Sequence, residues 1–227
     1  MPYRHGRGTA GVPFHVLNRG VRRMVLFDES VDYRTFLSCA TAVMRQVPVQ
    51  LLAYCLMPNH FHLVVQPVED GQLSAFMKRL EGTHSKRWHV RRQTTGTGAV
   101  YQGRFKAFPI QCDRHFYTVC RYVERNALRA GLVQKAEDWP WGSLGQRCRN
   151  SHFVPLSPWP ILQPPDWISL VNGDESGAYL KDVRQSVTTG RPFGESQWAV
   201  ATALDLRLES SLRPRGRPSS KDVGCLF

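Results

Sequence analysis

A predicted β-hairpin over residues 49–66 constrains the fold of this chain more than any other segment. Its first half, VQLLAYCLM, is a nearly continuous apolar run, which is typical of a strand buried on both faces. Pro58-Asn59 marks a tight turn, and the second half, HFHLVVQ, begins with strict polar and apolar alternation. Because side chains alternate across a strand, His60, His62, Val64 and Gln66 lie on one face and Phe61, Leu63 and Val65 on the other.

The rest of the first 150 residues supplies strands and helices around this hairpin. Strands are predicted over residues 13–18 and 100–111, and helices after Asp28, from Leu73 to Trp88, and from Asp113 to Gly131. The resulting order, β-α-β-β-α-β-α, matches an α+β split β-α-β fold, an antiparallel sheet whose helices cover one face, with one extra helix.

The sequence divides into three parts by composition. We predict a main domain over residues 1–148, a tail or wrap rich in proline and tryptophan over 149–190, and a last part over 191–227. The last part contains a short helix with Trp198, Ala201, Leu204 and Leu208 on one face, followed by a basic arginine and proline tail. This tail is either a DNA-binding hook or a disordered end.

Charge and hydropathy narrow the function classes. The chain of 227 residues has 30 Lys and Arg against 18 Asp and Glu, a net charge of +12, which suits a polyanion such as nucleic acid or an anionic membrane surface. No apolar run approaches the roughly 18 residues of a transmembrane helix, and no signal peptide is recognisable. The six cysteines are scattered without a Cys-x-x-Cys pair, which indicates reduced thiols. These features predict a soluble cytoplasmic protein.

Two pairs of residues carry the strongest chemical signal. His60 and His62 point to one side of a strand, where two neutral imidazoles provide two ligands for a divalent ion, although such a pair alone is more often structural. Tyr122 and Asn126 are four residues apart on the third helix and lie off its apolar stripe. A tyrosine beside a His-pair metal site can attack a phosphodiester, and Asn126 can supply a third ligand oxygen. The alternative is that both residues only satisfy local hydrogen bonds.

Four ordered segments, MPNHFHLVVQP, VYQGRFKA, RYVERNALRAGLV and DWPWGSL, resemble the REP-associated tyrosine transposases, a branch of the single-tyrosine HUH transposases. The similarity extends over roughly residues 10–147. It implies a ferredoxin-like sheet, His60, His62 and Asn126 as ligands of Mg²⁺ or Mn²⁺, and Tyr122 as the nucleophile. Such enzymes cut single-stranded DNA beside hairpin repeats, form a 5′-phosphotyrosine and a free 3′-hydroxyl, and rejoin the strand. The resemblance also implies a bacterial protein associated with the nucleoid through DNA.

The sequence departs from the family pattern at two positions. Ala127 stands where proline is usual, so the third helix is expected to continue to Gly131. Tyr101 stands where tryptophan is usual and adds a competing tyrosine on a strand-like segment. His15 on the first strand is more consistent with a structural histidine than with a site residue, and Glu124 is a weak candidate for a general base.

Basic residues are the candidate DNA contacts, with a solvated basic face as the alternative. They are Arg4, Arg19, Arg22, Arg23, Lys78, Arg79, Lys86, Arg104, Arg213, Arg215 and Arg217. The aromatic side chains of Trp88, Tyr101 and Phe105 can stack on exposed bases, but burial is the more common outcome.

Two other functions stay open at this point: a protein that binds hairpin DNA without cutting it, and an HUH nickase of replication or mobilisation. The chain is short for the nickases, which usually carry further domains. The sequence leaves open whether the protein is a monomer or a homodimer.

Overall fold

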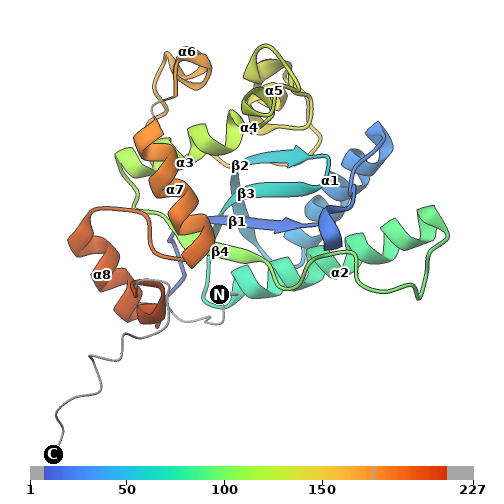
Figure 1. Cartoon of the computed structure of the whole chain (residues 1–227), viewed down its shortest axis with the longest axis horizontal. Helices are drawn as coiled ribbons and strands as arrows, with labels where there is room; N and C mark the ends of the chain where they lie inside the picture. Colours follow the sequence, from blue (N-terminus) through green and yellow to red (C-terminus); the bar gives the residue numbers. More distant parts are fainter. Residues whose placement is uncertain (1–7, 176, 214–227) are drawn as a thin grey trace, which may run out of the picture.

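A four-stranded antiparallel sheet forms the centre of the computed structural model, which describes residues 8–175 and 177–213. The strands are β1 (Phe14–Arg19), β2 (Val49–Met57), β3 (His60–Pro67) and β4 (Lys106–Pro109). Their order is β2-β3-β1-β4, and every neighbouring pair is antiparallel. The α+β ferredoxin-like fold is therefore confirmed, with the predicted hairpin forming β2 and β3 (Figure 1).

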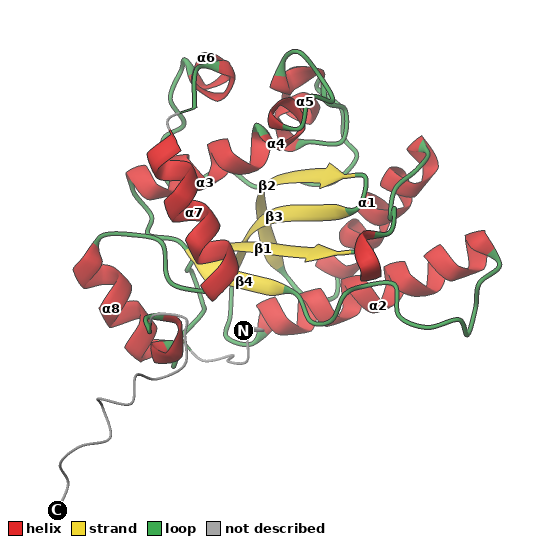
Figure 2. Cartoon of the chain, viewed as in Figure 1, coloured by secondary structure: helices red, strands yellow, loops and turns green. Residues whose placement is uncertain are grey.

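The helices lie on both sides of this sheet (Figure 2). They are α1 (Ser30–Met44), α2 (Gln72–Arg92), α3 (Arg114–Glu124), α4 (Asn126–Arg129), α5 (Ser143–Cys148), α6 (Trp167–Asn172), α7 (Gly177–Thr189) and α8 (Ser196–Asp205). Three short 3₁₀ helices are η1 (Val21–Arg23), η2 (Ala136–Asp138) and η3 (Glu209–Ser211). In the described residues, no helix is long and apolar enough to cross a membrane.

Strand alternation divides the core into two layers. Phe61, Leu63 and Val65 of β3 pack with the buried residues of α1 and α2 on one face. Val64 of β3 packs with Phe116 and other residues of α3 on the opposite face. The helices of the split β-α-β unit thus cover one face, as predicted, and the extra helix α3 covers the other.

Several element boundaries differ from prediction. The first helix begins after Glu29 rather than Asp28, because the Asp32 carboxylate accepts the backbone N–H groups of both residues before the helix. Segment 100–111 forms only the short strand β4, and Tyr101 makes a single isolated bridge to Gly20. The predicted cap of α3 is confirmed, since the Asp113 side chain accepts the backbone N–H of His115 (2.8 Å).

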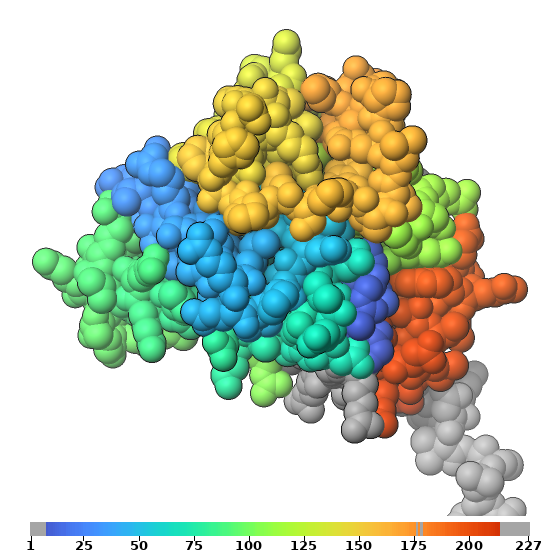
Figure 3. Space-filling view, turned by 180° about the vertical axis from the view of Figure 1, so that it is seen from behind, coloured from blue at the N-terminus to red at the C-terminus, as the bar shows by residue number. Residues whose placement is uncertain are grey.

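The part after residue 148 is more structured than a simple tail. Its first stretch crosses β2, where Ser157 N–H and the Trp159 indole donate to the carbonyl oxygens of Leu51 and Leu52 (both 2.9 Å). Helices α6 and α7 follow and pack against α3. Figure 3 shows this segment, coloured yellow to orange, along the upper part of the molecule, next to the blue and cyan residues from the first part of the chain. The division of the chain into three parts stays a prediction.

The predicted apolar face of α8 is wrong. Ala199, Thr202 and Ala203 are buried, whereas Leu204 is 57% exposed and Ala201 is also exposed. The buried face of α8 therefore consists of small side chains instead of the large apolar residues that the pattern indicated.

Candidate active site

The two histidines of β3 lie on the α3 side of the sheet with their rings in edge contact. Their ring centroids are 5.0 Å apart, and His62 is 4% exposed. Asn59 Oδ1 is 2.7 Å from His60 Nδ1, while Asn59 Nδ2 donates to the Arg23 carbonyl oxygen (3.4 Å). Because Oδ1 can only accept, His60 Nδ1 carries the proton and Nε2 keeps its lone pair.

His62 is oriented by a third imidazole from the neighbouring strand. His15 of β1 stacks on His62 with centroids 5.0 Å apart, and His15 Nε2 is 2.8 Å from His62 Nδ1. Burial lowers the pKa of His15 to about 3 and the pKa of His62 well below its usual value. Burial, together with the charge of Arg19, lowers the pKa of His60 to about 4. All three imidazoles are therefore neutral at pH 7.

Tyr122 reaches this group from the opposite layer. Its ring meets His62 edge-on at 5.8 Å between centroids and His15 at 6.0 Å, and the residue is 8% exposed. The Arg129 guanidinium carbon lies over the ring, 4.5 Å from its centroid. A cation placed over a phenol ring attracts its electron-rich face and restricts its orientation. The Tyr122 ring is thus in contact with two histidines and one arginine.

Asn126 is close to Tyr122 in sequence but lies in a different helix. The chain bends at Arg125, where α3 ends and α4 begins, although Ala127 permits a continuous helix. Both Arg129 terminal nitrogens lie 3.2 Å from the Tyr122 carbonyl oxygen and satisfy it there. The expectation of one helix reaching Gly131 is therefore wrong. Asn126 is 8% exposed at the first position of α4, which packs on β2.

The two histidines of β3 fit a divalent metal through their Nε2 atoms. Asn59 is hydrogen-bonded to Nδ1 of His60, and His15 is hydrogen-bonded to Nδ1 of His62. Metal-binding histidines usually have such a hydrogen bond on the nitrogen that does not bind the metal, and it orients the ring. In the described part of the chain, no group of three His, Cys, Asp or Glu side chains is arranged to hold a metal. An amide oxygen such as that of Asn126 is another type of ligand that suits a hard divalent ion.

Comparison with known proteins identifies the family. A family model described as "Transposase IS200 like" matches residues 10–126, more than half of the chain. The chain belongs to the IS200-like transposase family. A protein of Haemophilus influenzae assigned as a REP-associated tyrosine transposase is 26% identical over 157 residues, which cover 63% of this chain and 84% of that protein.

A solved structure shares the fold of this transposase. It is a REP-associated tyrosine transposase bound to a REP hairpin, with 20% identity, a TM-score of 0.55, and coverage of 78% of this chain and 95% of the solved one. The resemblance to REP-associated tyrosine transposases that the four sequence segments indicated is thus confirmed.

Two weaker candidates for catalytic residues of the transposase have other partners in the structure. Tyr101 is buried on the α2 side of the sheet, where its hydroxyl lies 2.7 Å from His84 Nδ1, so it does not compete with Tyr122. Glu124 is buried away from the histidines and bonds Ser143, Arg147 Nη1 (2.7 Å) and Trp167 Nε1 (2.7 Å). These bonds anchor the later part of the chain, and none of Glu124's hydrogen-bond partners is a histidine of the site.

The candidate DNA contacts fall into different settings. Arg19 pairs with His60 across β1 and β3, and Arg22 and Arg23 are exposed in η1 with positive φ angles of 52° and 62°. Arg79 is exposed and donates to Gln46 Oε1 (2.7 Å). The exposed residues Lys78, Lys86 and Arg104 line one groove.

The structure describes only some of the candidate DNA contacts near the two ends of the chain. Arg213 is exposed, whereas Arg215 and Arg217, like Arg4 near the start of the chain, lie outside the described residues. Among the aromatic candidates, Trp88 is half-buried and donates to the Leu26 carbonyl oxygen (3.1 Å), and Phe105 is 8% exposed. These two rings are packed rather than free for stacking.

Sequence reasoning missed Arg129 and undervalued His15. Arg129 stands seven residues after Tyr122, a spacing that returns to the same helical face after two turns and could have indicated the contact. His15 alternates with the apolar residues of β1, but only the pairing of β1 with β3 brings it beside His62. Roles of all these residues in catalysis stay predictions.

Proposed function

We propose that this transposase is a metal-dependent strand transferase that cuts and rejoins single-stranded DNA next to hairpin repeats, with Tyr122 as its nucleophile. The observation that carries the proposal is the edge-on contact of the Tyr122 ring, on α3, with the rings of His62 on β3 and His15 on β1. Hairpin DNA is the substrate class because the solved relative is bound to a REP hairpin and this chain has a net charge of +12.

The reaction is a balanced transfer of one phosphodiester. Tyr122 loses its phenolic proton to water, its oxygen bonds to phosphorus, and the bond from phosphorus to the 3′-oxygen breaks, after which that oxygen takes up a proton. The 5′-phosphate stays on Tyr122 until a 3′-hydroxyl attacks and restores the phosphodiester. Each phosphodiester is replaced by a phosphotyrosine ester, so no nucleotide hydrolysis is required.

The residues around Tyr122 have distinct roles in this scheme. His60 and His62, with the amide oxygen of Asn126, would hold Mg²⁺ or Mn²⁺, which supplies Lewis-acid stabilisation of charge on the phosphate. His15 orients His62 through the 2.8 Å contact, and Arg129 restrains the Tyr122 ring. The neutral state of the histidines at pH 7 leaves their lone pairs available.

The experiment incubates the protein and Tyr122→Phe with hairpin DNA carrying single-stranded flanks, labelled at either the 5′ or the 3′ end, with Mg²⁺ or Mn²⁺. The hairpins come from palindromic repeats flanking the gene. We expect a protein adduct that retains only the 3′ label, depends on metal, and disappears in Tyr122→Phe. Denaturing gels measure the adduct.

Tyr117→Phe is the matched control, because Tyr117 is on the same helix and donates to the Leu162 carbonyl oxygen instead of facing the histidines. It should form the adduct at the wild-type level. Adducts that persist in Tyr122→Phe would refute the assignment of the nucleophile. Binding without any adduct would favour a protein that recognises hairpins without cutting them, and activity confined to supercoiled duplex would favour a nickase.

A further inference from the structure

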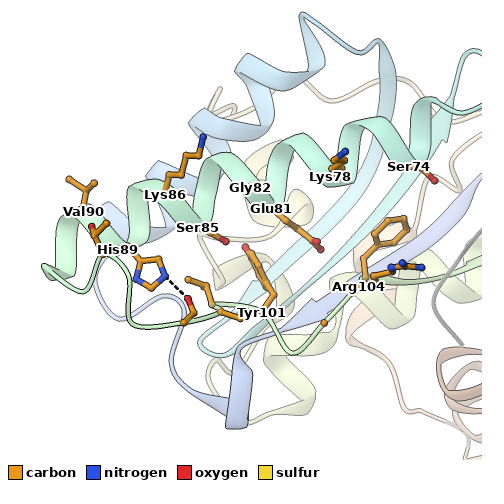
Figure 4. A pocket seen from close by; sticks show the side chains of 16 residues that line it. Ser74, Lys78, Glu81, Gly82, Ser85, Lys86, His89, Val90, Tyr101 and Arg104 are labelled. Atoms are coloured by element: carbon orange, nitrogen blue, oxygen red, sulfur yellow. Dashed lines mark hydrogen bonds between the residues drawn. The ribbon is translucent and has the colours of Figure 1, made fainter.

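A groove separate from the Tyr122 site lies between α2 and the chain segment 98–105 (Figure 4). Its volume is about 1380 Å³, above the roughly 300–1,000 Å³ of most small-molecule pockets. At one end His89 Nε2 donates to the Gly98 carbonyl oxygen (3.0 Å) and ties the two walls together. An open groove of this volume suits a segment of a polymer.

Cations line both walls of the groove. Lys78 and Lys86 belong to α2, and Arg104 belongs to the opposite wall. All three are exposed, and within the described residues none of them forms a salt bridge. By contrast, Arg91 and Arg92 at the end of α2 pair with Asp32. These three side chains therefore keep positive charge that no salt bridge among the described residues neutralises, as a site for a phosphate backbone requires.

One carboxylate lies within this basic groove. Glu81 projects from α2 toward the opposite wall (Figure 4), and its Oε1 accepts a hydrogen bond from Asn18 Nδ2 (2.8 Å). Burial raises the pKa of Glu81 to about 7, although the Asn18 bond lowers it again in part. Above about pH 7 Glu81 is ionised, and because a carboxylate repels phosphate, its partner is then a group that donates hydrogen bonds. Unpaired bases offer such donors on their Watson–Crick edges.

The position of Asn18 connects the groove to the Tyr122 site. Asn18 and Arg19 are consecutive on β1 and face opposite sides of the sheet. Arg19 pairs with His60 of the site, whereas Asn18 donates both to Glu81 and to the Gly103 carbonyl oxygen (3.0 Å) in the groove wall. A DNA strand that passes around the end of β1 therefore runs from the groove on one face of the sheet to the Tyr122 site on the other.

We propose that this groove holds an unpaired segment of the DNA strand, with its phosphates on Lys78 and Arg104 and a guanine edge on the Glu81 carboxylate. Guanine fits because its N1–H and N2–H donors are adjacent, whereas adenine and cytosine present an acceptor nitrogen beside their amino group. Thymine has a single donor between two carbonyl oxygens. Glu81 is then a specificity-determining residue of the proposed DNA strand transferase, on which this inference rests.

The test measures binding by fluorescence anisotropy in EDTA, so that no strand is cut, and at about pH 8.5, where Glu81 is ionised. The probes are hairpins whose single-stranded flanks carry each of the four bases in turn at every position. At one flank position we expect the wild type to favour guanine about tenfold or more. Glu81→Gln should abolish this preference, because the amide replaces one acceptor oxygen with a donor and its remaining oxygen can still accept from Asn18.

The cation part of the site has its own variant and control. Lys78→Ala with Arg104→Ala should weaken all probes alike and reduce the salt slope by about 1.4, because each phosphate contact on a single strand contributes about 0.7. Arg34→Ala with Lys135→Ala removes the same charge from exposed positions outside the groove and should leave the slope nearly unchanged. Thermal unfolding verifies that each variant is folded.

The outcomes separate this inference from the proposed function. An unchanged base preference in folded Glu81→Gln overturns the role of Glu81, and an equal loss of affinity in the control pair overturns the groove as the binding site. Both results are compatible with Tyr122-dependent adducts. If no adducts form but a guanine preference depends on Glu81, the groove is supported as a binding site. Only the proposed strand transfer is then refuted.

Discussion

At the scale of single residues, the pair His15 and His62 decides whether His62 can bind a metal. If His62 Nδ1–H donates to His15, His62 Nε2 is free to coordinate. We predict that His15→Phe, which removes this acceptor, lowers Mn²⁺ affinity by about 10- to 100-fold. Titration of Mn²⁺ followed by electron paramagnetic resonance measures the affinity without DNA or catalysis.

His84→Phe is the control for this change. It replaces another buried imidazole, in the core layer on the other face of the sheet, where its partner is the Tyr101 hydroxyl. It should reduce stability, because that hydroxyl loses its partner, but leave Mn²⁺ affinity unchanged. Equal Mn²⁺ affinity in His15→Phe and wild type would contradict the orienting role of His15.

At the scale of elements, an ion-pair cluster joins α1 to α2. Arg91 Nε and Arg92 Nη2 contact the Asp32 carboxylate at 3.0 and 2.8 Å. Burial alone would raise the pKa of Asp32, but hydrogen bonds from Arg92 and from the Asp28 and Glu29 amides outweigh it and lower the pKa to about 2. Because the folded-state pKa lies below the usual 3.8, this stabilisation is present above about pH 4 and is lost as the pH falls toward 2.

We predict that Asp32→Asn lowers the free energy of unfolding by about 1–2 kcal/mol at pH 7. The difference from wild type should shrink as the pH falls from 5 toward 2, because Asp32 becomes protonated in the unfolded chain near pH 3.8 and in the folded protein only near pH 2. Urea unfolding at several pH values measures this difference. Asp138→Asn, at an exposed position in η2, should change stability little. A difference that stays constant down to pH 2 would contradict the prediction.

At the scale of the whole molecule, Glu124 connects the first 148 residues to the later part of the chain. Its side chain is fully buried and bonds Arg147 and Trp167 from elements on either side of that boundary. We predict that Glu124→Ala costs about 2–4 kcal/mol, because Arg147 and Trp167 lose a charged partner in a dry environment. Urea unfolding measures this loss.

The same variant separates the anchoring role of Glu124 from a catalytic one. At temperatures where Glu124→Ala is folded, it should still form the DNA adduct, since Glu124 contacts none of the histidines of the site. Glu209→Ala, at an exposed position, serves as the control for stability. Loss of adducts in folded Glu124→Ala would restore the general-base interpretation.

Local patterns in the sequence determined the strands of the hairpin, the cap of α3 and the side of β3 on which the histidines lie. Each of these depends on neighbouring residues, such as the alternation of His60, Phe61 and His62 or the Asp113 side chain beside the next amides. The order of elements was sufficient for the ferredoxin-like fold. These features could be predicted because their causes lie within a few residues.

Only the tertiary structure decided which of these residues meet and which charges remain free. His15 reaches His62 through the register of β1 on β3, and Arg129 ends α3 early by taking over the Tyr122 carbonyl oxygen. Arg92 forms an ion pair with Asp32, whereas Lys78 forms none among the described residues and lines the groove, although both are basic residues of α2. Their partners are distant in sequence, so pairing and burial depend on packing between elements rather than on local pattern.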